Sequence, residues 1–238
     1  MEQKHRAGNQ ERRPLLLASA SPRRHEILGR IDVPFSIVPA DLDEDGFAEG
    51  FQGSYPELVE ALAIAKARAV AAARPGFAGL ILAADTTVIL DGDMLSKPRD
   101  PDEAVSMLRR LRGRMHQVAT GVALHDCQTD TLESAHITTK VWMRPYSDEE
   151  IAVYVATGDS LDKAGAYAVQ HELFHPVERV EGCYLTVVGL PLCLVTKLLR
   201  KHGVATLPLI PGAEGQTGNC MWSVQCRPPL PAGAQAFL

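Results

Sequence analysis

Residues 15–24 read Leu-Leu-Leu-Ala-Ser-Ala-Ser-Pro-Arg-Arg, and they join an apolar run directly to a helix start. The run Leu15–Ala18 predicts a short buried strand. Ser21 is placed as an N-cap and Pro22 as the first helical residue, which predicts a helix over Pro22–Arg30. The stretch therefore predicts a strand that is followed closely by a helix.

Outward from this stretch, predicted helices and strands alternate irregularly along the chain. Further strands are expected at Phe35–Pro39, Leu80–Leu90, Met94–Leu95, Gln117–His125, Leu132–Met143 and Tyr184–Val188. Further helices are expected at Pro56–Ala73, Pro101–Leu111, from Ser147 onward with Glu150 as capping-box partner, and at Pro191–His202. The acidic, glycine-containing stretch Asp41–Ser54 is expected to be a loop. This order predicts an α/β fold with one curved, mixed sheet.

The size and charge of the chain limit what it can be. Its 238 residues, 46% of them hydrophobic, are enough to bury a full core in one domain or two tightly joined lobes. A net charge of −5 provides no broad basic surface, so nucleic acid is not an expected partner. No run of 18 apolar residues occurs, so no membrane span is expected.

Composition also divides the chain into three parts. Met1–Arg13 is polar and charged, which predicts a flexible leader. One folded domain is expected over residues 14–205. The proline- and glycine-rich residues 206–238 lack periodicity and predict a disordered or loosely docked tail.

The cysteine and glycine patterns exclude several classes of protein. The five cysteines are odd in number and form no C-x-x-C pair, which favours reduced thiols in a cytoplasmic protein. The sequence contains no H-E-x-x-H motif, so a zinc site is not expected. The motifs of P-loop ATPases, of dinucleotide-binding dehydrogenases and of serine hydrolases are also missing from the sequence.

Two arginines stand in the first turn of the helix predicted to begin at Pro22. Arg23 and Arg24 add positive charge where the helix already carries partial positive charge. Together with free backbone N–H groups and the hydroxyls of Ser19 and Ser21, they would form a trap for an anion, and phosphate is the natural ligand. The alternative is that both arginines point into water or pair with carboxylates.

Asp85 is an acidic residue inside an otherwise apolar run. Burying a carboxylate there is costly unless it is paired, hydrogen-bonded or bound to a metal. We expect it at a strand end that faces a cleft, where it could orient water or hold Mg²⁺ for attack on phosphorus. The alternative is an aspartate that caps a turn.

Other polar residues are candidates for the same site. Lys66 and Lys97 could each neutralise phosphate charge, or could be surface lysines. In the segment Asp162–Gln170, small residues around Gly165 would let the backbone approach a ligand, and Gln170 could read a uracil or thymine edge. Both features could instead belong to a surface turn.

Six segments together resemble the Maf family of nucleoside triphosphate pyrophosphatases. They occur in the family's order between about Leu15 and His202: Leu17–Arg24, Ala65–Ala67, Ala84–Thr86, Lys97-Pro98, Asp162–Tyr167 and Val187–Leu192. The resemblance implies an elongated, two-lobed fold related to inosine triphosphate pyrophosphatases, with a deep cleft. It also implies a divalent cation, Mg²⁺ or alternatively Mn²⁺ or Co²⁺, and a homodimer.

The resemblance also assigns roles to residues. It implies that Asp85 is the proton acceptor, and that Glu44 and Asp85 lie at the metal. The substrate contacts that it implies are Ser19, Arg23, Arg24, Lys66, Thr86, Lys97, Lys163 and Gln170. In the family, the positions of Arg23, Thr86 and Gln170 vary with the substrate, and this combination resembles the branch that acts on dTTP and UTP.

Two other classes of function stay open at this point. A non-catalytic nucleotide sensor would need the phosphate clamp but not a base such as Asp85. A purely structural α/β domain would leave the clustered arginines, lysines and aspartate unexplained.

Overall fold

The computed structural model describes residues 13–206. Residues 1–12 of the predicted leader and residues 207–238 of the predicted tail lie outside the described residues. Arg13 itself donates hydrogen bonds to both carboxylate oxygens of Asp126. The first described residue is therefore fixed to the domain.

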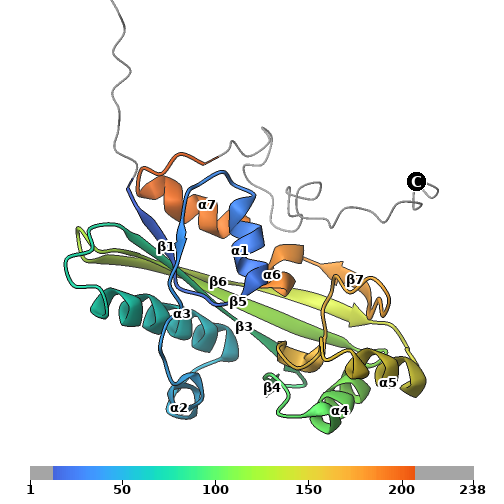
Figure 1. Cartoon of the computed structure of the whole chain (residues 1–238). Coiled ribbons are helices and arrows are strands. Elements are labelled where there is room, and N and C mark those ends of the chain that lie inside the picture. Colours follow the sequence, from blue (N-terminus) through green and yellow to red (C-terminus); the bar gives the residue numbers. More distant parts are fainter. Residues whose placement is uncertain (1–12, 207–238) are drawn as a thin grey trace, which may run out of the picture.

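A seven-stranded mixed sheet forms the centre of the molecule (Figure 1). Its strands are β1 (Leu15–Leu17), β2 (Ser36–Ile37), β3 (Leu80–Leu90), β4 (Asp93–Leu95), β5 (Met115–Asp126), β6 (Thr131–Met143) and β7 (Val177–Glu181). The order is β2-β1-β3-β5-β6-β7, with β4 paired to β3. The pairs β2–β1 and β1–β3 are parallel and the other pairs are antiparallel, which confirms the predicted mixed sheet.

Seven α-helices and one 3-10 turn accompany the sheet in residues 13–206. They are α1 (Pro22–Gly29), α2 (Glu44–Glu49), α3 (Tyr55–Ala72), α4 (Pro101–Leu111), α5 (Asp148–Ala156), η1 (Ala164–Ala166), α6 (Tyr184–Val188) and α7 (Leu192–Lys201). None of these helices is long and apolar enough to cross a membrane.

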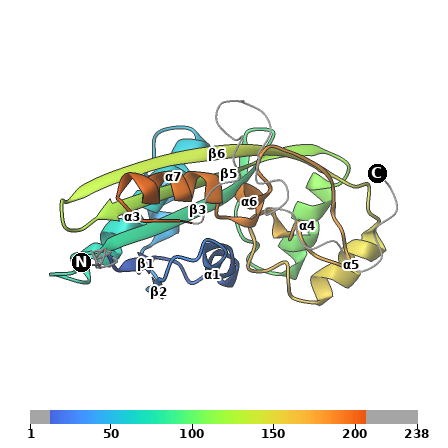
Figure 2. The same ribbon diagram turned by 90° about the horizontal axis from the view of Figure 1, so that it is seen from above.

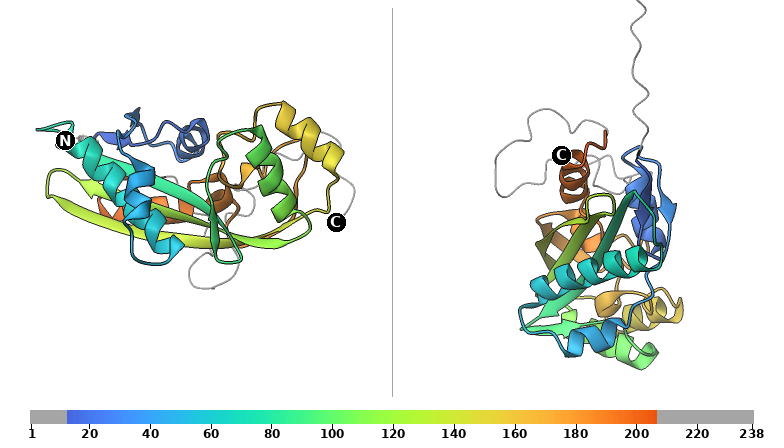
Figure 3. Two further views of the ribbon diagram at one scale, coloured as in Figure 1. Left: turned by 90° about the horizontal axis from the view of Figure 1, so that it is seen from below. Right: turned by 90° about the vertical axis from the view of Figure 1, so that its left-hand side faces the viewer.

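Alternate side chains of the strands enter two separate cores. Leu15 and Leu17 pack in the cluster that contains residues of α1, α6 and α7, whereas Leu16 packs in the cluster of α3. This alternation follows from the two-residue period of a strand. As a result, α3 covers one face of the sheet and α1, α6 and α7 cover the other (Figures 1 and 3).

A third core lies at the far end of the long strands. It joins the ends of β3, β5 and β6 to α4 and α5 through apolar side chains such as Leu108, Tyr146 and Tyr154. Seen from above, α4 and α5 extend the molecule away from α7 and give it an elongated outline (Figure 2). This agrees with the elongated α/β fold that the resemblance implied.

Most predicted elements are confirmed, but two interpretations were wrong. Tyr184–Val188 is the helix α6 and not a strand, because a short apolar run cannot distinguish the two and Gly189 ends it in a left-handed conformation. The expected loop Asp41–Ser54 contains the helix α2, whose first turn is capped by the Asp43 carboxylate. The strand β7 was not predicted.

Candidate active site

All ten residues that the sequence singled out line one cavity of about 730 Å³. They are Ser19, Arg23, Arg24, Glu44, Lys66, Asp85, Thr86, Lys97, Lys163 and Gln170. They come from the β1–α1 turn, from α1, α2, α3 and β3, from the segment after β4, and from the segment before β7. The ten residues therefore share one cavity, and their roles in binding and catalysis stay predictions.

The cavity lies where β3 lacks a neighbour on one edge. Leu80–Leu82 pair with β1 and Val88–Leu90 pair with β4, so no strand pairs with residues 83–87 on that edge. β5 pairs continuously with the other edge of β3. Asp85 therefore lies in the middle of a strand beside this gap, and not at a strand end as expected.

Asp85 and Thr86 point to opposite faces of the sheet, as neighbours on a strand must. Asp85 lies on the same face of β3 as Ile81 and Ala83, which pack against α3. It accepts a hydrogen bond from Lys66 of that helix. Thr86 lies on the opposite face and meets Arg24 of α1. The open edge lets both side chains line the same cavity.

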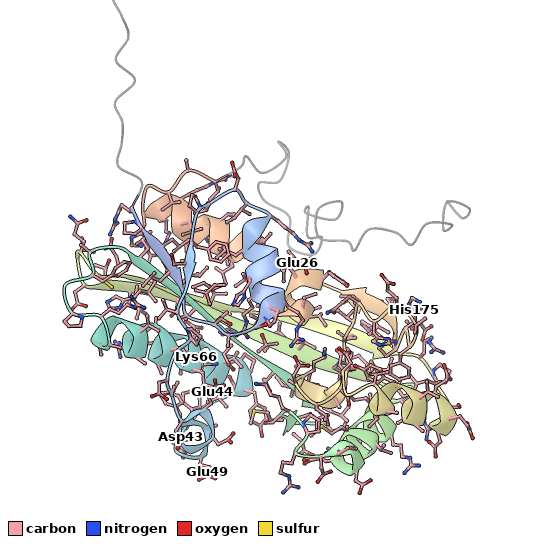
Figure 4. The ribbon with its side chains drawn as sticks, viewed as in Figure 1. Glu26, Asp43, Glu44, Glu49, Lys66 and His175 are labelled. Atoms are coloured by element: carbon pink, nitrogen blue, oxygen red, sulfur yellow. The ribbon has the colours of Figure 1, made fainter. Side chains whose placement is uncertain are left out.

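Lys66 lies between two carboxylates. Its Nζ atom is 2.6 Å from Asp85 Oδ1 and 2.9 Å from Glu44 Oε1. Lys66 and Asp85 are nearly buried, with 8% and 11% of their side chains exposed, whereas the Glu44 side chain is 48% exposed. Figure 4 shows Glu44 and Lys66 next to one another between α2 and α3. This lysine is therefore part of the site and not a surface lysine.

Arg24 is held by three different elements. Its Nε donates to the Gly189 carbonyl at 2.9 Å, and its two terminal nitrogens donate to Thr86 Oγ1 at 3.1 Å and Ser19 Oγ at 3.4 Å. Burial lowers the pKa of the Arg24 guanidinium, while the carboxylates of Asp85 and Glu44 raise it. The guanidinium is thus oriented in advance and does not have to be ordered by a ligand.

The start of α1 offers backbone donors beside these arginines. Ser21 is the N-cap, but its side chain makes no capping hydrogen bond, so N–H groups of the first turn stay available. Arg23 forms an ion pair with Asp162 at 3.0 Å. The alternative of arginines paired with carboxylates therefore applies to Arg23.

Lys163 is committed to protein groups. Its ammonium donates to the Asp159 carbonyl, to Asp159 Oδ1 at 2.7 Å and to Asp162 Oδ1 at 2.6 Å. An ammonium has three protons, so a direct substrate contact by Lys163 would require one of these bonds to break. Asp162, which the sequence reasoning did not select, holds both Lys163 and Arg23; its place beside Lys163 in the quoted segment was the available signal.

Lys97 and Gln170 have free polar ends. Both line the cavity, and neither side chain makes a hydrogen bond or ion pair with residues 13–206. Gly165 itself does not line the cavity, and a side chain there would meet Val88 of β3, whereas the neighbouring small residues Ala164 and Ala168 do line it. The small residues of this segment therefore serve both the packing of Gly165 against β3 and the wall of the cavity.

The charges of the cavity suit an anion together with a cation. Five cations line it, Arg23, Arg24, Lys66, Lys97 and Lys163, against five carboxylates, Asp43, Glu44, Asp45, Asp85 and Asp162. No group of three metal-ligating side chains occurs among the described residues. Mg²⁺ is commonly held by one or two carboxylates plus phosphate oxygens and water. Glu44 and Asp85, drawn together by one ammonium, fit that kind of site.

The fold and the site define a class of α/β protein with a large, charge-paired cavity whose cations suit a phosphorylated ligand. A family model described as "Maf-like protein" matches residues 14–202. The chain belongs to the Maf family.

Three similar proteins share one name. A protein of Salinibacter ruber named dTTP/UTP pyrophosphatase is 50% identical over 188 residues, 79% of this chain and 90% of that protein. Proteins of the same name from Thermomicrobium roseum and Citrifermentans bemidjiense are 47% and 45% identical over 190 residues, 79% of this chain in each case and 84% and 95% of their own lengths.

Proposed function

We propose that this chain hydrolyses dTTP and UTP, and modified forms of similar shape, to the monophosphate and pyrophosphate, which would cleanse the nucleotide pool. One observation carries the proposal: Arg24, Lys66 and Asp85 lie in a single cavity, with Asp85 held 2.6 Å from Lys66. The shared name of the relatives supports the same reaction and the same substrates.

The cations hold the triphosphate. Arg24 is oriented at the start of α1, where free backbone N–H groups also favour a phosphate. Lys97 has its whole ammonium available, and Arg23 can exchange Asp162 for a phosphate oxygen. Lys66 adds positive charge at the floor of the cavity, where burial strengthens its effect.

Asp85 acts on water. It orients a water molecule and accepts its proton as the oxygen attacks phosphorus, and the bond to the pyrophosphate group breaks. A divalent cation bound by Asp85 and Glu44 would offset the charge of the phosphate oxygens. Most of the rate enhancement would come from positioning and charge neutralisation.

Gln170 would recognise the base. Gln170 can donate and accept at once, as the edge of thymine or uracil requires. Arg23 and Thr86 line the same cavity and would contribute to the choice of substrate.

A nucleotide panel tests the proposal. The chain is incubated with each common triphosphate and Mg²⁺, Mn²⁺ or Co²⁺, and monophosphate and pyrophosphate are measured. We expect turnover of dTTP and UTP above the purine triphosphates, loss of turnover with a chelator, and recovery with added metal. Binding without turnover would identify a nucleotide sensor instead.

A homodimer and a cytoplasmic location complete the proposal. Sedimentation of the full chain at several concentrations measures the first, and fractionation of cells measures the second.

A further inference from the structure

A series of hydrogen bonds through two threonine hydroxyl groups, here called the threonine relay, connects Arg24 to the interior of the sheet. Arg24 donates to Thr86 Oγ1 at 3.1 Å, which lies 2.9 Å from Thr120 Oγ1, and Thr120 donates to the Thr186 carbonyl at 2.7 Å. Thr86 and Thr120 are directly opposed on the antiparallel strands β3 and β5. The threonine relay extends from α1 to α6, and both helices lie on the same face of the sheet (Figure 1).

The number of protons on each group determines which atom donates in every hydrogen bond of the threonine relay. A carbonyl can only accept a hydrogen bond, so Thr120 donates its single hydroxyl proton to the Thr186 carbonyl. Thr120 must therefore accept the hydrogen bond that it forms with Thr86, and Thr86 donates its hydroxyl proton to Thr120. Arg24 has only donors, so it donates to Thr86.

The carbonyl of Thr186 needs this donor. At the end of α6, the N–H groups of Gly189 and Leu190 both donate to the Leu185 carbonyl at 2.9 Å. The next carbonyl, that of Thr186, is buried and receives the Thr120 hydroxyl. The left-handed Gly189, with φ 119°, turns the chain so that its own carbonyl accepts from Arg24. The end of α6 thus holds Arg24 twice, directly and through two threonines.

We propose that Thr120 is a positioning residue for the phosphate-binding Arg24, and that it makes Thr86 an acceptor only. Thr120 is fully buried and does not line the cavity, so it acts through Thr86. Because the Thr86 proton is committed to Thr120, Thr86 presents only an oxygen lone pair and its methyl group to a ligand. Thr86 therefore repels phosphate oxygens and accepts a ligand N–H or O–H. This inference rests on the proposed function.

Three variants of buried threonines test the role. Thr120→Val removes the hydroxyl with little change of shape, and Thr120→Ser restores it. Thr139→Val is the matched control, because Thr139 is equally buried on the neighbouring strand and its hydroxyl donates to the Cys183 carbonyl at the start of α6. We expect Thr120→Val to lower kcat/KM for dTTP about tenfold, Thr120→Ser to stay near wild type, and Thr139→Val to lose stability without this loss of rate.

A double-mutant cycle shows whether the two threonines act as a unit. Thr86→Val removes the other hydroxyl of the threonine relay. The double variant Thr86→Val/Thr120→Val should therefore be no slower than the slower of the two single variants. Multiplied effects of the two substitutions would overturn the inference, and so would a wild-type rate in Thr120→Val. An equal loss of rate in Thr139→Val would overturn it as well.

A measurement on Arg24 itself separates this inference from the proposed function. The Nε–H signal of Arg24, identified by its disappearance in Arg24→Lys, is followed by NMR hydrogen exchange in the full chain without substrate. We expect faster exchange in Thr120→Val, and the wild-type rate in Thr120→Ser and Thr139→Val. If the chain hydrolyses no triphosphate, the proposed function fails, while this exchange rate still decides the role of Thr120. Unchanged exchange in Thr120→Val would overturn that role.

Discussion

Replacing Asp85 with asparagine tests the centre of the proposed mechanism. The change keeps the shape of the side chain but removes its negative charge and its ability to accept a proton. General bases contribute roughly 10²- to 10⁴-fold to a rate, so we expect kcat to fall by about 10³, or about 4 kcal/mol in activation free energy. Weaker binding of the proposed divalent cation would add to this loss.

The expected cost of Asp85→Asn in stability is smaller. Breaking a buried ion pair typically costs about 3–5 kcal/mol. Here Lys66 keeps Glu44 at 2.9 Å, and the asparagine amide can still offer an oxygen, so we expect about 1–2 kcal/mol. That loss leaves the fold intact, because folded domains have about 5–15 kcal/mol of stability.

The assay is pyrophosphate release from dTTP under saturating substrate and metal, alongside chemical denaturation. Asp126→Asn is the matched control, since Asp126 is also a buried carboxylate, held by Arg13 and His202, and does not line the cavity. It should lose at least as much stability and keep its rate within about twofold. Turnover of Asp85→Asn within tenfold of wild type would refute the assignment of Asp85 as the base.

Three further variants test separate parts of the structure. Gln170→Ala should change the ranking of dTTP, UTP and the purine triphosphates more than the rate on the best one; an unchanged ranking would remove Gln170 from base recognition. Burial lowers the pKa of His116 from 6.5 to about 4, so the unfolded chain binds more protons between these values and stability falls as the pH drops through them, by up to about 3 kcal/mol. His116→Gln should lack this component in denaturation curves at pH 7 and 4.5, and an identical pH slope in both proteins would contradict it. Gly121→Ala should cost several kcal/mol in unfolding free energy, because its Cβ would lie 2.4 Å from backbone atoms of Val59 and Glu60 in α3; a wild-type melting temperature would show that α3 can move away.

The sequence alone determined the long elements and proposed a set of residues that share one cavity. Periodicity and capping residues located α3, α4 and the paired strands β5 and β6, because long elements repeat their pattern many times. The six segments that resemble the Maf family contain eight of the ten candidate residues, and Glu44 and Gln170 lie outside them; all ten line the cavity. Short elements were less certain, because the five residues of α6, Tyr-Leu-Thr-Val-Val, are too few to show a period and three of them are β-branched.

Only the tertiary structure decided which of these side chains meet. Asp85 and Thr86 are neighbours in sequence but face opposite sides of β3, so one joins Lys66 and the other joins Arg24. The role of Thr120 depends on the register between β3 and β5, and a shift of one residue would turn it to the other face. The gap between β1 and β4 arises from strand pairing. Pairing and register join residues far apart in the chain, and no local pattern records them.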